Sequence, residues 1–583
     1  MTLSNAIVRA RPRVSAESPG PAAAPRRALT APVAALVIVL GLGVFARFDR
    51  LAWHFTSADD LLPMTQLYGA AAGHEWQPYR YAKEVATHST YAPLQYLLYP
   101  LLLSPDTGYR TMLFLGRLPS AILSALAVLL TAIALWRAKG RCDWGVVLGA
   151  GVSAFSLLSI VYAHQMSPYA FGLFGAATLV LVLHWTLETE SPRRRHLLAL
   201  VAGFLPYASY QLILLSGVAL ASCALCDIRS QRLAGRWRTV VSSWLVSACV
   251  FVAVVAPITL KFILGMRARA NFGWQGAEQF FPFFDPSASS LTLVWDTVSY
   301  LANCYYHALA NQLANVDPAT PALAFWMGPV LVLGGWGAIQ SLRSSQPARF
   351  GVGIFVVGTL ALWGVLNLAG RLPLSPTRHT LVFLPLLAFA IGIGVSEFSA
   401  RARRAGDGIA AMLSAIAFCA FAYNYSEFQA ARQDPFDPKR LSALVEETHA
   451  DAIVEYAWTV QHSLMFRNGG PATVITMPRG WELERLDRLD PRPARVLFVS
   501  YFTGLHEFTH KGHSLYEALL ARGYSIQTLI EHHSTTPIET SRLLFNGTNS
   551  QYIYLATLAD VAASTAPSAA PGLVPSAARE TRR

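Results

Sequence analysis

Long apolar stretches alternate with short polar stretches over the first 425 residues of this 583-residue chain. A helix needs about 20 apolar residues to cross the hydrocarbon core of a bilayer. Counting stretches of roughly that length predicts about eleven membrane-spanning helices. They lie near residues 29–48, 117–136, 144–161, 170–187, 196–207, 209–226, 240–260, 322–339, 350–369, 379–396 and 408–425.

Two apolar segments need separate interpretation. The stretch His196–Cys226 is short for two spans, but basic clusters at both of its ends require the chain to return, so we expect two short helices there. The segment Pro93–Leu103 reaches only about a third to a half of a spanning length. We therefore expect Pro93–Leu103 to form a surface or re-entrant helix.

The composition agrees with a polytopic membrane protein, because 53% of the residues are hydrophobic, only 14% are charged and the mean hydropathy is +0.37. The net charge of +12 is concentrated in arginine clusters between apolar segments, which sets topology and gives no reason to expect nucleic acid as a partner. Basic loops face the cytoplasm, so the amino terminus is expected inside and the carboxyl terminus outside. The clusters are Arg137–Arg141, Arg193–Arg195, Arg229–Arg238, Arg343–Arg349 and Arg401–Arg404.

The tail of the chain has a different pattern. Short apolar runs such as Val496–Ser500 alternate with helical stretches such as His513–Arg522, which is typical of a small α/β domain. The abundance of Ala and Arg indicates a bacterial protein, so we expect the inner (plasma) membrane. The predicted parts are a disordered cytoplasmic segment 1–28, a membrane domain 29–425 with external loops 49–116 and 261–321, an extracytoplasmic domain 426–562 and a disordered end 563–583.

Two adjacent acids, Asp59 and Asp60, open the first external loop in the sequence Thr-Ser-Ala-Asp-Asp-Leu-Leu. The same loop later contains His88-Ser-Thr-Tyr91-Ala-Pro-Leu. Three further motifs flank apolar segments on the same predicted side. They are Arg117-Leu-Pro-Ser-Ala, Tyr162-Ala-His164-Gln165-Met-Ser-Pro-Tyr169 and Arg371-Leu-Pro-Leu-Ser-Pro-Thr-Arg378-His379.

In these motifs and their order, the chain resembles the C-type glycosyltransferase superfamily (GT-C), which includes protein O-mannosyltransferases and lipid A aminoarabinose transferases. The resemblance covers roughly residues 30–425. It implies an inverting membrane glycosyltransferase that takes a sugar from a polyprenyl-phosphate donor to a lipid, glycan or protein acceptor. No cofactor is implied, since the mannosyltransferases do not require a metal, although other branches of the superfamily use one.

The chain departs from the family pattern at two motifs. Tyr91-Ala-Pro-Leu stands where relatives often have His-Pro-Pro-Leu, and His164-Gln-Met-Ser-Pro-Tyr stands where they often have Gln-Glu-Ala-Arg-Pro-Tyr. Two positions that are charged in relatives are therefore neutral here. These differences leave the donor sugar and the phosphate ligands open.

Asp59 is the expected general base for the acceptor hydroxyl, with Asp60 assisting it. The alternative is that both acids cap an amphipathic helix beginning near Leu61. Basic groups on the outer side suit the donor phosphate or, equally, lipid headgroups. The candidates for the phosphate are Arg371, Arg378, His379 and Lys261. The candidates for other substrate contacts, for which plain helix packing is the alternative, are Arg80, Lys83, His88, Tyr91, His164, Gln165 and Tyr169.

Two rival functions remain. His506-Glu507-Phe-Thr-His510 is a formal HExxH motif, which on a helix holds zinc with the Glu as base, but Gly504 and Gly512 leave too little regular helix for it. A polytopic transporter or lipid-sugar flippase predicts internal repeats and ionisable groups at the bilayer midplane. The acids of this chain instead concentrate in the outer loops.

Overall fold

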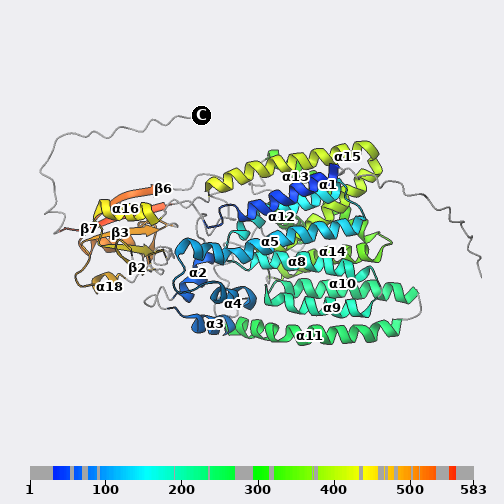
Figure 1. The fold of residues 1–583 in the computed structure, drawn as a ribbon, viewed down its shortest axis with the longest axis horizontal. Coiled ribbons are helices and arrows are strands. Elements are labelled where there is room, and N and C mark those ends of the chain that lie inside the picture. The colour runs from blue at the N-terminus through cyan, green and yellow to red at the C-terminus, as the bar shows by residue number, and fades with distance from the viewer. Residues whose placement is uncertain are drawn as a thin grey trace, which may run out of the picture.

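The computed structural model confirms a polytopic helical region followed by a small domain built on a sheet (Figure 1). The segments predicted to be disordered, 1–28 and 563–583, lie outside the described residues. The structure describes residues 31–52, 58–68, 76–87, 92–189, 191–233, 237–268, 293–313, 321–369, 372, 374, 378–431, 438–456, 465–466, 470–477, 483–500, 503–510, 512–532 and 551–559.

Eight helical stretches in this described part of the chain are long and apolar enough to span a membrane, and a bent pair makes up to nine. Every predicted apolar segment is helical, but three of the eleven do not form straight spans. The helices are α1 (Ala31–Phe48), α2 (Ala58–Leu67), α3 (Pro78–Thr87), α4 (Pro93–Leu102), α5 (Tyr109–Lys139), α6 (Trp144–Phe155), α7 (Leu157–Ala163), α8 (Tyr169–Leu187), α9 (Pro192–Phe204), η1 (Leu205–Tyr207), α10 (Leu212–Leu233), α11 (Trp237–Ala268), α12 (Leu293–Leu313), α13 (Pro321–Leu342), α14 (Pro347–Leu368), η3 (Arg378–Phe383) and α15 (Leu384–Ala431).

The three differences have local causes. The predicted span 144–161 is broken between α6 and α7, which meet at an angle of 47°. The predicted span 196–207 falls in α9, whose 13 residues give a length of about 20 Å, too short for a typical bilayer. In α13 the apolar stretch Met327–Leu342 is below spanning length. The segment Pro93–Leu103 forms the short helix α4, as the apolar length predicted.

Helix α12 lies within the stretch 261–321, which was predicted to be an external loop. Polar residues such as Asp296 and Asn303 interrupt its apolar residues, which explains why hydropathy did not indicate a helix there. Helix α15 carries two candidate spans, His379–Ala402 and Ala405–Tyr423. The chain turns sharply between the two spans. This turn follows from the proximity of Gly406 to Ser399, since a Cβ placed on Gly406 would lie 2.6 Å from the Cα of Ser399.

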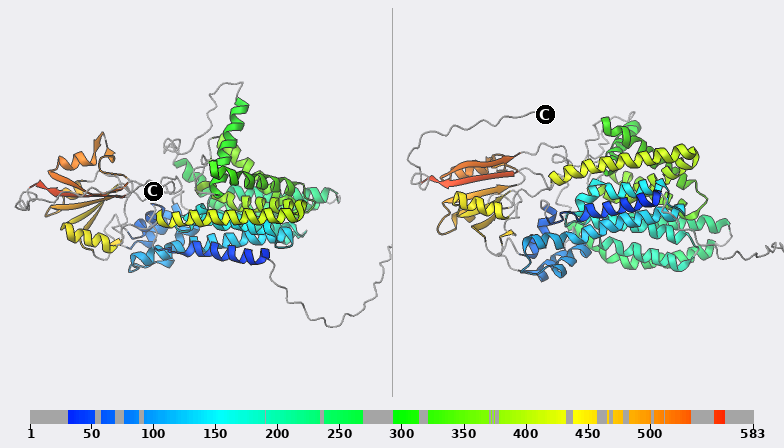
Figure 2. Two further views of the ribbon diagram at one scale, coloured as in Figure 1. Left: turned by 90° about the horizontal axis from the view of Figure 1, so that it is seen from above. Right: turned by 45° about the horizontal axis from the view of Figure 1, so that its top comes forward.

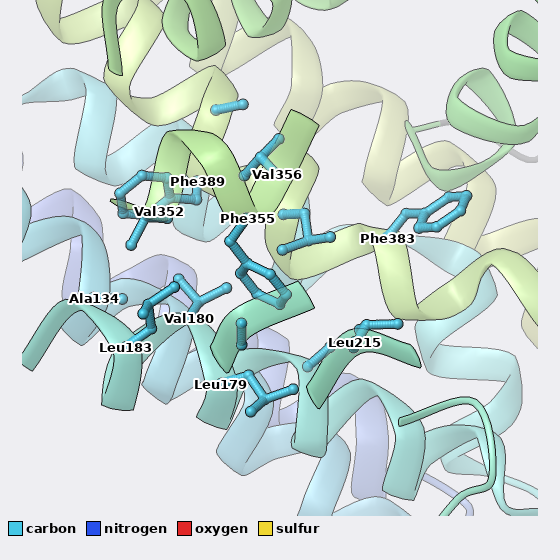
Figure 3. Packing of buried hydrophobic residues seen from close by; sticks show 14 of the residues in the cluster. Ala134, Leu179, Val180, Leu183, Leu215, Val352, Phe355, Val356, Phe383 and Phe389 are labelled. Carbon is cyan, nitrogen blue, oxygen red and sulfur yellow. The ribbon is translucent and has the colours of Figure 1, made fainter. Parts of the chain in front are cut away.

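The helices run side by side around an apolar core (Figures 1 and 2). In its centre, Phe355 of α14 lies between Leu179 of α8 and Leu215 of α10, and Phe383 approaches from η3 (Figure 3). All four side chains are buried. Because lipid tails are as apolar as leucine, close packing of this kind holds membrane helices together more than hydrophobic transfer does.

Basic loops gather at one end of the bundle, as their alternation along the chain predicted. Glu397 of α15 accepts hydrogen bonds from Lys139 at the end of α5 (3.2 Å) and from Arg349 of α14 (2.9 Å). Arg137 pairs with Glu188 at the end of α8 through a 3.0 Å bond. The orientation of this end toward the cytoplasm remains a prediction from charge.

Helices α2, α3 and α4 form a module at the opposite end of the bundle, which is predicted to be external, next to the tail domain (Figure 1). Their apolar residues share one buried cluster with the start of α5. We call this cluster the outer core. It consists of Met64, Leu67, Tyr68, Tyr81, Val85, Tyr96, Tyr99, Leu103, Tyr109, Met112, Leu113 and Met166.

The tail domain is a five-stranded mixed sheet in the order β2-β1-β3-β7-β6. Its first three strands are parallel, and β7 and β6 add antiparallel pairs. Helix α16 packs on one face through Leu441, and α19 packs on the other through Leu515. The elements are α16 (Pro438–Thr448), β1 (Ala452–Tyr456), β2 (Thr473–Met477), α18 (Glu484–Asp487), β3 (Arg495–Ser500), β4 (Thr509–His510), β5 (His513–Ser514), α19 (Leu515–Leu520), β6 (Tyr524–His532) and β7 (Gln551–Leu558).

Candidate functional site

Asp59 and Asp60 are the second and third residues of α2, which begins at Ala58. Their side chains lie outside the described residues. Carboxylates in the first turn of a helix interact favourably with the positive end of its dipole. The placement is therefore compatible with the helix-capping alternative as well as with catalysis, and it puts the helix start three residues before the expected Leu61.

The outer core joins α2 to the His164–Tyr169 motif. Met64 and Leu67 of α2 pack in this cluster with Met166, which is fully buried. Met166 packs directly over Gly116 of α5, where a Cβ would lie 2.6 Å from the Met166 sulfur. Two motifs separated by about a hundred residues of sequence thus share one packing unit.

The His164–Tyr169 segment is a tight connection between α7 and α8. His164 is fully buried, and its Nε2 donates to the carbonyl of Ala46 in α1 over 2.9 Å. Gln165 and Ser167 are also buried. His164 therefore connects helices in this structure, while substrate contact by His164 and Gln165 stays a prediction.

A row of aromatic and amide side chains continues from this segment. The ring of Tyr169 lies 5.1 Å from that of Tyr162 and 5.7 Å from that of His379 in η3, with the histidine edge-on. Gln211 Nε2 is 3.1 Å from His379 Nδ1. With the amide donating, the neutral ring carries its proton on Nε2 and offers it as a donor. The structure thus brings together the predicted residues Tyr169 and His379.

Two members of this row were not predicted as site residues. Tyr162 is the first residue of the motif Tyr162–Tyr169, so this motif was the sequence signal that could have identified Tyr162 as a site residue. Gln211 lies directly before α10, within the predicted span 209–226. Nothing in the local sequence connects Gln211 with His379, which is 168 residues away.

The predicted cations fall into different environments. Lys261 of α11 donates to the carbonyl of Val85 over 2.6 Å and so holds the last turn of α3. Arg80 is exposed and forms an ion pair with Glu84 over 3.4 Å, and Lys83 is exposed on the same helix. His88, Tyr91 and Arg371 lie outside the described residues, as does the side chain of Arg378.

Two arginines that were not predicted as site residues hold the base of the first external loop. Arg117 is fully buried and donates to the carbonyl of Leu51 over 2.8 Å. Arg110 donates to the carbonyl of Ala52 over 2.9 Å. Both are on α5, so α5 fixes the point from which the chain leads toward α2.

Several buried oxygen atoms near these segments have no hydrogen-bond partner among the described residues. They are Gln95 Oε1 on α4, Gln165 Oε1, Ser167 Oγ and Gln211 Oε1. Buried polar atoms without protein partners are usually satisfied by water or a ligand. Two apolar grooves of about 220 and 500 Å³ lie elsewhere, between α1 and α5 and between α10 and α11, and contain none of the predicted site residues.

The HExxH motif of the tail domain does not form a helix. His506 and Glu507 lie in a turn, and His510 ends the short strand β4. Glu507 Oε2 accepts from Thr503 Oγ1 over 2.9 Å and from the Gly504 amide over 3.2 Å, so it stabilises the turn. Within the described part of the chain, no three acidic, His or Cys side chains are grouped as metal ligands.

Comparison of the sequence with models of protein families and with curated proteins finds no match. The candidate site is therefore defined by its own residues and contacts. It comprises α2, the His164–Tyr169 segment and His379, all at the end of the bundle that is opposite to the basic loops.

Proposed function

We propose that this protein is a membrane-embedded glycosyltransferase that takes a sugar from a polyprenyl-phosphate donor and transfers it to an acceptor hydroxyl outside the cytoplasm. One observation supports the proposal: α2, which bears Asp59 and Asp60, shares the outer core with Met166 of the His164–Tyr169 segment, whose last residue contacts His379. The helix that bears the acids, the buried polar residues of this segment and a phosphate-binding candidate therefore lie at one end of the bundle, which supports the proposal.

In the proposed reaction, the Asp59 carboxylate takes the proton of the acceptor hydroxyl as that oxygen attacks the anomeric carbon. The bond between the anomeric carbon and the phosphate oxygen breaks, and polyprenyl phosphate leaves with the electron pair. A single displacement inverts the anomeric configuration. Asp60 lies about 100° further around the helix, so it assists the first acid and does not duplicate it.

The leaving phosphate gains negative charge, which donors and cations at the site stabilise. His379 supplies an Nε2–H donor beside Tyr169. Arg378 precedes it in the same short helix. Gln165 and Ser167 are proposed to bind hydroxyl groups of the sugar, because their buried oxygen atoms have no partner among the described residues.

The test uses the full chain, purified and reconstituted in liposomes with a panel of polyprenyl-phosphate monosaccharides and a bacterial envelope extract as acceptor. Mass spectrometry measures free polyprenyl phosphate and the glycosylated product. We expect one donor of the panel to release polyprenyl phosphate together with product. If no donor is consumed but labelled lipid-linked sugar moves between leaflets, the chain is a flippase and the proposed function is wrong.

A further inference from the structure

A fully buried arginine fills the break between α6 and α7. Arg47 is on α1 and has no exposed surface. Its NH1 and NH2 groups donate to the carbonyls of Ala154 (2.8 Å) and Ser153 (3.0 Å), which belong to the last turn of α6. Because α6 stops at Phe155, these carbonyls lack their usual helical donors.

The other contacts of Arg47 reach three further positions. NH2 also donates to Ser159 Oγ in α7 over 2.7 Å, and Nε donates to Ser124 Oγ in α5 over 2.7 Å. NH1 donates to the carbonyl of Gly43 one turn earlier in α1 over 2.6 Å. The guanidinium group thus connects α1, α5, α6 and α7 through five oxygen atoms, and none of the five is a carboxylate.

These hydrogen bonds supply the donors that backbone carbonyls of a broken helix need inside a membrane. In hydrocarbon a backbone carbonyl without a donor is costly, so a broken helix persists only where another group satisfies it. A cation also suits the end of α6, since the carboxyl end of a helix carries partial negative charge. Arginine alone among the side chains presents five donors in a fixed fork, enough for carbonyls and hydroxyls at once.

The break between α6 and α7 determines the direction in which the chain enters the His164–Tyr169 segment. Helix α7 ends at Ala163, and the next residue, His164, donates to the carbonyl of Ala46, the neighbour of Arg47. Two consecutive residues of α1 therefore hold both ends of α7. The His164–Tyr169 segment follows directly, and α1 leads through Leu51 toward α2.

We propose that Arg47 is a positioning residue, which locks the α6–α7 break and so sets the His164–Tyr169 segment against α2 and its acids. The catalytic consequence rests on the proposed glycosyl transfer, whereas the structural consequence does not. We assign Arg47 no part in the transfer chemistry, because five protein oxygen atoms already accept from its five guanidinium N–H groups.

The experiment compares R47Q and R47K with the parent in the full chain, reconstituted in liposomes. R137Q is the matched control, because it removes an arginine that pairs with Glu188 at the opposite end of the bundle. Hydrogen–deuterium exchange of residues 157–169 reports the segment directly. The rate of sugar release at varied donor concentration separates kcat from KM.

We expect R47Q to speed exchange in residues 157–169 by about tenfold, because the local opening becomes less costly. A misplacement of about 1 Å lowers kcat by about 10²-fold, with KM within about threefold of the parent. R47K keeps the charge but has three donors, so it gives smaller changes of the same sign and provides a folded variant where R47Q does not accumulate. R137Q leaves exchange in 157–169 and kcat unchanged.

Unchanged exchange in residues 157–169 of R47Q overturns the proposal, and so does faster exchange with parental kcat. Equal losses in R47Q and R137Q also overturn it, because the effect is then one of general stability. If the parent itself transfers no sugar, the proposed function fails by itself. The exchange result still decides in that case whether Arg47 fixes this segment.

Discussion

A close helix contact in the bundle gives a sharp prediction for one substitution, Gly149→Ala. Helix α6 packs on α15 through glycines, and Gly149 faces the backbone of α15. A Cβ on Gly149 would lie 2.7 Å from the carbonyl oxygen of Ala388 and 2.6 Å from Leu135 Cδ1. The leucine can rotate away, but the carbonyl belongs to a helix backbone and moves only if α15 moves.

The matched control is Gly151→Ala, two residues along the same helix. There the nearest atom to a new Cβ is Phe155 Cδ2 at 4.0 Å, which is an ordinary contact. Both substitutions gain the helix propensity of Ala over Gly, about 1 kcal/mol. Only Gly149→Ala adds an overpacking cost of about 1 to 3 kcal/mol. The difference in unfolding free energy between the two variants therefore measures the overpacking cost at position 149 alone.

The assay is reversible unfolding in mixed micelles at increasing SDS fraction, followed by circular dichroism. Gly149→Ala is expected to be less stable than Gly151→Ala by about 1 to 3 kcal/mol, whereas Gly151→Ala matches or exceeds the parent. Equal stabilities of the two variants would show that α6 and α15 do not approach each other as closely as described, and the placement of both helices would be wrong.

Three further predictions concern single side chains. Tyr425→Phe removes a 2.7 Å hydrogen bond to the Asp49 carboxylate, so the unfolding free energy should fall by about 1.5 kcal/mol; an unchanged denaturation midpoint contradicts that bond. Lys261→Ala removes the donor to the Val85 carbonyl, so hydrogen–deuterium exchange of backbone amides should become faster in Pro78–Thr87 but not in the tail domain. Equal exchange in Pro78–Thr87 of the variant and the parent contradicts a stabilising role of this hydrogen bond. Burial raises the pKa of Tyr554 to about 12, above the value near 10 expected in the unfolded chain. The stabilising contribution of the neutral Tyr554 side chain is therefore complete below pH of about 10 and is lost as the pH approaches about 12. Tyr554→Phe should weaken the alkaline destabilisation of the tail domain, measured by fluorescence as a function of pH. Identical alkaline unfolding profiles of variant and parent contradict the raised pKa of Tyr554.

Hydropathy placed the long apolar helices, but it missed α12 and did not give the shape of the helices. It located every apolar segment, and it identified Pro93–Leu103 as too short to span. It did not indicate the break after Phe155, because the donor that makes the break tolerable is Arg47, 106 positions earlier than Ser153. A hydrogen bond from a residue so distant in sequence to a backbone carbonyl does not change the local apolar pattern.

In the tail domain, the continuous apolar run Val496–Ser500 predicted β3, which is the central strand of the sheet. In the edge strand β6, the alternation of apolar and polar residues is interrupted by an irregularity between Thr528 and Ile530, which shortens the strand signal. The capping box of Ser514 and Glu517 explains why the helix within His513–Arg522 begins where it does.

The candidate site was only partly visible in the sequence. Tyr169 and His379 belong to quoted motifs, and their proximity at 5.7 Å supports reading those motifs together. Arg117 opens a quoted motif, but its contact with Leu51 depends on tertiary structure. Gln211 has no local pattern that indicates its contact with His379. For Asp59 the structure gives a position in the first turn of α2, and its chemistry remains a proposal.

The central claim is that Asp59 is the base of a sugar transfer, and the most direct measurement is the transfer rate of Asp59→Asn in liposomes. Asp106→Asn is the control, since Asp106 is an exposed acid of the same external loop. We expect Asp59→Asn to lower kcat by about 10² to 10⁴-fold, and Asp106→Asn to keep the parental rate. An Asp59→Asn variant that is present in the membrane at parental level and transfers sugar as fast as the parent contradicts the account.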